Sequence, residues 1–229
     1  FVLTDGPFMP RGKLKPGEKT NRAEPGYFAW DPDADPLRDD CPIDLSHLNE
    51  SEAGVSGHVR REGNNFVLGD GRPVRFWMVQ GSGLMDMKPA MMDFWARRLA
   101  KYGVNLVRVQ MSSIFDDWKE NRRESFEKRV GRLHYLVSAL KKQGIYVYLG
   151  HLYWDTSEKI AEKHGFPGYG QGKTPLALLF FDPKMQAFYK RFASDLMNAP
   201  NPHTGIPMSK DPAIAVVEIQ NESSLLFWT

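Results

Sequence analysis

The sequence has little of several features that would assign a protein to a special class. Its single cysteine, Cys41, cannot form a disulfide within the chain, which leaves the redox compartment open. No apolar run approaches the roughly 18 residues of a membrane-spanning helix. A formal net charge of +2 gives no electrostatic case for nucleic-acid binding. The chain begins without methionine or a signal peptide, so we expect a mature or trimmed product, with neither nucleic acid nor membrane as a partner.

Metal-binding patterns are also missing. Asp31, Asp33 and Asp35 alternate as the carboxylates of a calcium loop do, but Pro36 and Pro42 stand where that loop needs glycine and glutamate. No spacing of histidines with carboxylates matches a metal-dependent barrel enzyme such as a phosphatase. We therefore expect no metal ion and no cofactor.

Composition divides the chain in two. Residues 1–45 are rich in proline, glycine and charge and show little periodicity. We interpret residues 1–56 as an irregular N-terminal arm or linker and residues 57–229 as the folded domain. With 41% hydrophobic and 12% aromatic residues, the chain can bury a sizeable core.

The folded domain begins with short strand patterns. Residues 59–60 and 65–68 flank an Asn-Asn turn signal, which predicts a β-hairpin. Residues 73–79 follow a second turn signal and are predicted to form the first core strand.

Strands and helices then alternate. Helical spacing predicts helices over 89–102, 126–142 and 183–197, and β-branched runs predict strands over 104–109 and 145–149 and from 214. This order implies an α/β fold with parallel strands and right-handed crossovers. Residues 152–182, rich in glycine and aromatics, form a long connection for which we expect a functional role.

The stretch I-A-V-V-E-I-Q-N-E-S, residues 214–223, runs from apolar into polar residues. A buried parallel strand has this pattern when its carboxyl end emerges at a site. Alternation puts Glu218 and Glu222 on one face. In an extended strand Glu218 lies about 13 Å below Glu222, so we interpret Glu218 as a core carboxylate and place the site at Asn221 and Glu222.

Other polar residues stand at neighbouring strand ends. Arg108 lies near the end of the second strand, His151 at the end of the third, and Asn221 and Glu222 at the end of the fourth. In a parallel α/β barrel these ends share one face, where active sites form. Alone, Arg108 and His151 are each better explained as structural residues, so the convergence carries the prediction.

These motifs resemble those of the retaining glycoside hydrolases on the (β/α)8 barrel, a clan that includes cellulases and β-mannanases. The resemblance rests on G-V-N-L-V-R-V with Arg108, Y-L-G-H with His151, and D-P-A-I-A-V-V-E-I-Q-N-E, which ends in Glu222. It extends from about residue 57 to the end. It implies a parallel TIM-barrel fold of which this chain holds only the first four β/α units, the N-terminal half, preceded by the β-hairpin.

The resemblance implies that Glu222 is the general acid that protonates the glycosidic oxygen and then the base that activates water. A retaining mechanism needs a second carboxylate about 5 to 5.5 Å away as nucleophile. In the clan this is a glutamate at the end of the seventh strand, and Asp116, Asp117 and Asp155 do not match it. We therefore expect this chain to be a fragment of a longer enzyme whose remaining protein supplies the other half of the barrel.

Substrate-binding roles follow from the same resemblance. Asn221 would bond the sugar 2-hydroxyl, Arg108 would keep the nucleophile ionised, and His151 would line the subsite. Trp154, and also Trp118, would offer ring faces on which pyranose rings stack.

The function implied is hydrolysis of a β-linked polysaccharide by a glycosidase, an endo-β-glycanase such as a cellulase or mannanase. Agar-type glycans are an alternative substrate, because the loops determine which sugar is bound and the fold does not. Polymer-degrading enzymes usually act outside the cytoplasm, so we expect a secreted or periplasmic protein. The alternative is a catalytically silent carbohydrate-binding or interaction module on a barrel scaffold that keeps the aromatic loop and lacks the second carboxylate.

Overall fold

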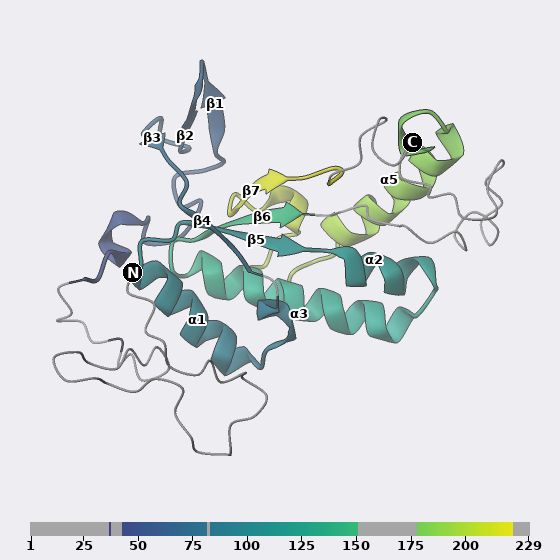
Figure 1. The fold of residues 1–229 in the computed structure, drawn as a ribbon, viewed down its shortest axis with the longest axis horizontal. Coiled ribbons are helices and arrows are strands. Elements are labelled where there is room, and N and C mark those ends of the chain that lie inside the picture. Colours follow the sequence, from purple (N-terminus) through teal and green to yellow (C-terminus); the bar gives the residue numbers. More distant parts are fainter. Residues whose placement is uncertain (1–36, 38–42, 82, 151–177, 222–229) are drawn as a thin grey trace, which may run out of the picture. The chain divides into compact units, whose positions relative to one another are not determined.

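The computed structural model describes residues 37, 43–81, 83–150 and 178–221 (Figure 1). The chain divides into two units, Phe1–Arg38 and Asp39–Thr229. All residues discussed below belong to the second unit.

A parallel sheet forms the centre of this unit. Its four strands pair in chain order, each parallel to the next: β4 (Met78–Gln80), β5 (Leu106–Gln110), β6 (Tyr146–Gly150) and β7 (Ile214–Val217). One row of aligned residues crosses the whole sheet, consisting of Gln80, Arg108, Tyr148 and Val216. The predicted α/β class with parallel pairing is confirmed.

Four α-helices connect or follow these strands in the described ranges: α1 (Pro89–Lys101), α2 (Ser112–Lys119), α3 (Arg123–Lys141) and α5 (Pro183–Met197). Short 3₁₀ helices are η3 (Ser46–Leu48), η4 (Leu84–Asp86), η5 (Leu178–Phe180) and η6 (Met208–Lys210). Helices α1, α3 and α5 lie where the sequence predicts them, whereas α2 was not predicted. None of the helices in these ranges has the length and apolar character needed to cross a membrane.

Local residue chemistry explains where the helices begin and end. The Asp182 carboxylate accepts the Met185 amide at 2.9 Å, which caps α5, and Pro183 occupies the first helical position. Gly103 and Gly144 follow α1 and α3 with φ of 73° and 68°, a conformation that ends a helix at little steric cost for glycine.

A small antiparallel sheet precedes the parallel one. It consists of β1 (Arg60–Glu62), β2 (Asn65–Val67) and β3 (Pro73–Val74), and the β1–β2 turn begins at Gly63, whose φ is 60°. The single strand predicted over 73–79 is divided between the two sheets. The break falls where the Trp77 amide donates to Asn105 Oδ1 at 2.7 Å, a side-chain acceptor in place of a strand carbonyl.

The two faces of the parallel sheet have different coverings. Val107, Val109, Val147 and Leu149 are fully or almost fully buried against side chains of the four α-helices. On the other face, Leu106, Tyr146 and Tyr148 pack with residues from the strands and loops, namely Ala53, Val59, Leu68, Val74, Phe76, Ala213 and Ala215. Figure 1 shows the sheet between α1 and α3 on one side and β1 to β3 on the other. Helices on a single face are typical of a barrel wall rather than of a doubly wound sheet.

Residues just before the hairpin are bound to the parallel sheet. The Glu50 carboxylate, 3% exposed, accepts from the Tyr146 hydroxyl, from Ser56 Oγ at 2.6 Å, from the Gly54 amide at 3.2 Å and from Arg72 at 3.3 Å. Burial, and after it the Glu50 hydrogen bond and charge, raise the pKa of Tyr146. The domain boundary at residue 56 remains a prediction.

We predict that Glu50→Ala lowers the free energy of unfolding by roughly 2 to 4 kcal/mol, because it leaves buried donors without an acceptor. Urea denaturation would measure this loss. Glu52→Ala is the matched control, since the Glu52 side chain is 52% exposed and its ion pair with Lys141 is 3.5 Å long; it should cost less than about 1 kcal/mol. Equal losses for the two variants would contradict a structural role for the Glu50 network.

Candidate active site

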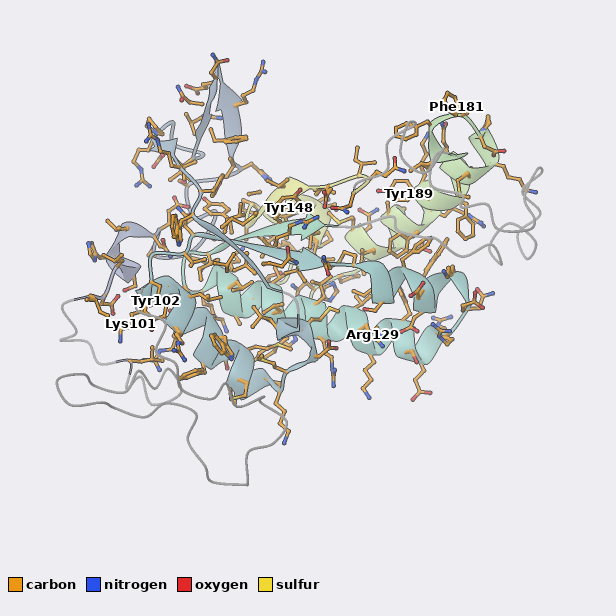
Figure 2. All side chains as sticks on the ribbon, viewed as in Figure 1. Lys101, Tyr102, Arg129, Tyr148, Phe181 and Tyr189 are labelled. Atoms are coloured by element: carbon orange, nitrogen blue, oxygen red, sulfur yellow. The ribbon has the colours of Figure 1, made fainter. Side chains whose placement is uncertain are left out.

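A polar cluster lies at the carboxyl ends of the parallel strands. Gln80 ends β4, Arg108 lies near the end of β5, Tyr148 lies near the end of β6, and Glu218 and Asn221 follow β7. The Glu218 amide donates to the Leu149 carbonyl at 2.9 Å, which continues the β6 pairing past the end of β7. Side chains from all four strands therefore meet on the face opposite the helices; Figure 2 labels Tyr148 there.

Arg108 connects the members of this cluster. Its Nη2 donates to Glu218 Oε2 at 2.6 Å and to Asn221 Oδ1 at 2.7 Å, and its Nη1 donates to Gln80 Oε1 at 3.2 Å. Its guanidinium carbon lies 5.3 Å from the centre of the Tyr148 ring, within the range of a cation–π contact. One side chain thus contacts two amides, a carboxylate and a phenol ring.

Partial burial strengthens these interactions. The Arg108 and Glu218 side chains are 17% and 18% exposed. Burial lowers the pKa of Arg108, but the hydrogen bond and charge of Glu218 outweigh it, so that this pKa lies above its ordinary value. Burial, followed by the charge of Glu218, raises the pKa of Tyr148. Around neutral pH the cluster therefore holds a permanent cation beside a neutral phenol.

Gly150 leaves the space that Arg108 occupies. A methyl group at this position would lie 2.8 Å from Arg108 Nε, closer than real Cβ contacts allow, and 3.0 Å from Glu218 Oε2, which is tighter than most of them. The glycine at the end of β6 thus permits the guanidinium to cross the strand toward Glu218.

The structure brings together two of the predicted site residues, Arg108 and Asn221, which are directly hydrogen-bonded. Glu222, His151 and Trp154 lie outside the described residues. The interpretation of Glu218 as a core carboxylate is wrong. Its side chain is 18% exposed and forms an ion pair with Arg108 at 2.6 Å, in the space that Gly150 leaves between them.

Trp118 does not lie in this cluster. It packs in the helix layer against Phe188 and Phe192, with ring centres 5.0 and 5.4 Å away, and its indole N–H donates to Asp195 on α5 at 2.8 Å. Because α2 carries it away from the sheet, Trp118 is separate from the strand-end cluster. The expectation that a pyranose ring stacks on its face stays a prediction.

The neighbouring aspartates are also engaged on the helices. Asp117 is nearly buried and accepts from Arg122 and Arg129 at 2.7 and 2.8 Å, while Asp116 pairs with Lys119 at 2.9 Å.

Sequence reasoning missed Gln80 and Tyr148 as members of the cluster. A usable signal existed for both. Gln80 is a polar residue that ends a strand, and Tyr148 lies two positions after the buried Tyr146 and so on the same face of β6. In the part of the chain that the structure describes, no group of three or more histidines, cysteines and carboxylates could hold a metal ion.

Solved structures that are similar to this chain include a mannanase and a mannosidase. The endo-1,4-β-mannanase from Rhizomucor miehei aligns with a TM-score of 0.55 at 19% identity, over 72% of this chain and 48% of that one. A mutant glycoside hydrolase family 5 mannosidase from the same organism, in complex with mannosyl-fructose, aligns with a TM-score of 0.55 at 18% identity, over 73% of this chain and 49% of that one. This chain spans about half the length of these structures.

At such identities the likeness concerns the fold, and it confirms the resemblance to the barrel glycoside hydrolases at that level. No protein-family model matches the sequence. No curated protein sequence matches it either.

Proposed function

We propose that this protein is a retaining glycoside hydrolase acting on a β-linked polysaccharide, with Glu222 as its general acid and base. The observation that supports this best is the cluster at the carboxyl ends of the parallel strands, in which Arg108 holds Asn221 at 2.7 Å. Asn221 directly precedes Glu222 in the sequence, and in this proposal Glu222 would act at the same edge of the sheet.

In this proposal the chain forms the first four β/α units of an eight-unit barrel, preceded by the hairpin. Helices on a single face of the sheet support it. The other half of the barrel, from the rest of the protein, would supply the nucleophilic carboxylate about 5 to 5.5 Å from Glu222. The permanent charge of Arg108 would favour the ionised form of that carboxylate.

The reaction would proceed in two steps. Glu222 protonates the glycosidic oxygen while the nucleophile attacks the anomeric carbon, which releases the leaving sugar and forms a glycosyl-enzyme. Glu222, now ionised, takes a proton from water, which displaces the nucleophile and restores both carboxyl groups. Because Asn221 Oδ1 accepts from Arg108, the side-chain amide is oriented with Nδ2 as its donor, the atom suited to a sugar 2-hydroxyl.

The substrate and the cellular location of the protein are also proposals. Mannan is the first polysaccharide to test, because one neighbour in structure is an endo-1,4-β-mannanase and another is a mannosidase in complex with mannosyl-fructose. Cellulose and agar-type glycans are the next, and His151 and Trp154 are proposed to line the subsites. An enzyme for such polymers would act after secretion or in the periplasm and would need no cofactor.

The test is hydrolysis of mannan, cellulose, agarose and aryl β-glycosides by the protein in its natural full-length form. We expect new reducing ends from at least one polymer, and a first-formed product in the β configuration by proton NMR. Release of an α product would contradict the retaining mechanism. Binding of a polysaccharide without hydrolysis would contradict the enzyme and identify the silent binding module.

A further inference from the structure

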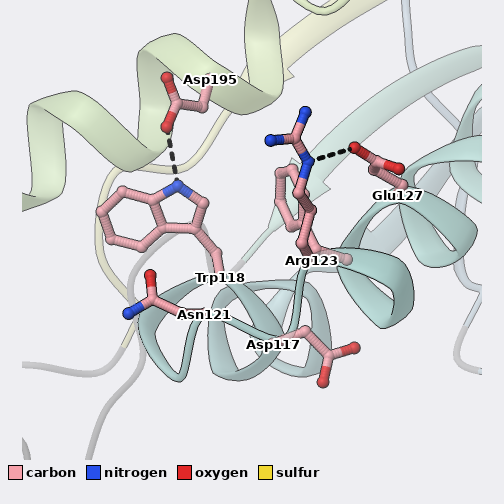
Figure 3. Close-up of a pocket in the computed structure, with 7 residues that line it drawn as sticks. Asp117, Trp118, Asn121, Arg123, Glu127 and Asp195 are labelled. Carbon is pink, nitrogen blue, oxygen red and sulfur yellow. Dashed lines mark hydrogen bonds and ion pairs between the residues drawn. The ribbon is translucent and has the colours of Figure 1, made fainter.

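A second site lies in the helix layer, away from the Arg108 cluster. A pocket of about 420 Å³ opens between the end of α2, the first turns of α3, and α5. This volume lies in the range of small-molecule binding sites. We call it the Trp118 pocket; it is lined by two aromatic side chains, Trp118 and Phe126, and five polar ones, Asp117, Asn121, Arg123, Glu127 and Asp195 (Figure 3).

Trp118 is held rigidly in this pocket. Its ring packs on Phe115, Phe188 and Phe192, and its indole N–H donates to Asp195 at 2.8 Å. An indole fixed in this way presents apolar surface without losing rotamer freedom on binding.

The polar side chains form an almost neutral rim. Asp117 is neutralised by Arg122 and Arg129, and Arg123 pairs with Glu127 at 2.8 Å. Of the three carboxylates that line the pocket, Asp117 and Glu127 are thus paired with guanidinium groups and Asp195 accepts the indole N–H, so little unpaired charge is left to select an ion. These polar groups also disfavour a purely apolar ligand, because they would lose their hydrogen bonds to water and gain none from the ligand.

We propose that the Trp118 pocket binds a neutral sugar chain, in particular a β-linked oligosaccharide. A pyranose ring has an apolar C–H face that can cover the indole and a rim of hydroxyls that both donate and accept. Asn121, Asp195 and Arg123 lie around Trp118 and offer amide, carboxylate and guanidinium partners for such hydroxyls (Figure 3). The pocket would hold a polymeric substrate at a distance from the catalytic edge.

Sugar binding follows from the lining of the pocket, whereas the role in holding substrate rests on the proposed function. For a catalytic domain that cleaves a polymer, a second contact on the same chain raises the effective concentration of substrate at the active edge. Loss of the pocket should therefore raise KM for the polymer and leave kcat/KM for a small aryl glycoside unchanged.

The direct test is titration of the full-length Glu222→Gln protein with β-1,4-linked mannohexaose and cellohexaose, observed at the indole N–H signal of Trp118 by NMR. We expect at least one hexasaccharide to shift that signal at millimolar concentration or below. Asp195→Ala and Asn121→Gly should each weaken this binding about 10-fold. The second variant suits the backbone, since Asn121 has a φ of 54° that glycine adopts readily.

Glu124→Ala is the matched control, because Glu124 is exposed on the same turn of α3 and does not line the pocket. It should leave binding unchanged. An unshifted Trp118 signal with both hexasaccharides would overturn the proposal, as would equal binding by the Asp195, Asn121 and Glu124 variants. Either result would leave the hydrolysis test untouched, so failure of the pocket and failure of the proposed function are distinguishable.

Discussion

Glu222→Gln is expected to lower kcat for polysaccharide hydrolysis by roughly 1,000-fold, within the range that a positioned acid and base contribute. Glutamine keeps the size of the side chain but can neither donate a proton to the glycosidic oxygen nor accept one from water. Because a polysaccharide leaves as an alkoxide unless it is protonated, its departure depends on this acid. The measurement is release of reducing sugar at saturating substrate by the full-length protein.

The same variant tests whether Glu222 acts as the general acid, in addition to whether activity depends on it. An aryl glycoside with an acidic phenol departs without full protonation, so formation of its glycosyl-enzyme should be slowed far less than cleavage of the polymer. An initial burst of phenol followed by slow turnover is the expected course. Glu124→Gln, at an exposed carboxylate on α3, serves as the control and should retain activity. A Glu222→Gln protein that degrades the polymer at the normal rate would exclude this residue as the acid.

Arg108→Met is the second large effect, with an expected loss of about 100-fold in kcat/KM. The substitution removes the donor that orients Asn221 and leaves the Glu218 carboxylate, 18% exposed, without its 2.6 Å partner. Breaking a partly buried ion pair also costs stability, about 2 to 3 kcal/mol here. Steady-state kinetics and urea denaturation on the same preparation would measure both losses.

A conservative variant separates geometry from charge at this position. Arg108→Lys keeps a cation but cannot reach Gln80, Glu218 and Asn221 with one planar group over the Tyr148 ring. We expect it to recover most of the stability and only a minor part of the activity. If Arg108→Lys were fully active, the planar guanidinium and its three simultaneous hydrogen-bond partners would have no part in catalysis. If Arg108→Met lost stability alone, Arg108 would be a purely structural residue.

The regular elements of the fold could largely be predicted from the sequence, because each carries a strong local signal. Helix α5 begins at Pro183 after the cap residue Asp182, and α1 and α3 are followed by Gly103 and Gly144. Strands β5 and β6 are β-branched runs placed between such helices. Helix α2 was missed because it is short and its cap, Met111, makes no side-chain hydrogen bond, although Ile114, Phe115 and Trp118 have helical spacing.

The site could be predicted only in part. Arg108 and Asn221 were identified by their places at strand ends, and their hydrogen bond follows from the parallel register that brings those ends together. Alternation places Glu218 on the face of the site, but the pairing of Glu218 with Arg108 does not follow from alternation alone. It depends on how the chain runs after β7, where Glu218 pairs through its backbone with Leu149, and on the space that Gly150 leaves.

The strand order of the parallel sheet has a consequence for how this domain is assembled during synthesis. Each strand pairs with the one made just before it, and aligned residues are 28 positions apart for Gln80 and Arg108 and 68 for Tyr148 and Val216. Because the entropy of closing a loop grows with its length, these pairings cost less than any that skip a strand. The sheet can therefore lengthen by one strand at a time as the chain leaves the ribosome, with each finished edge serving as the template for the next strand.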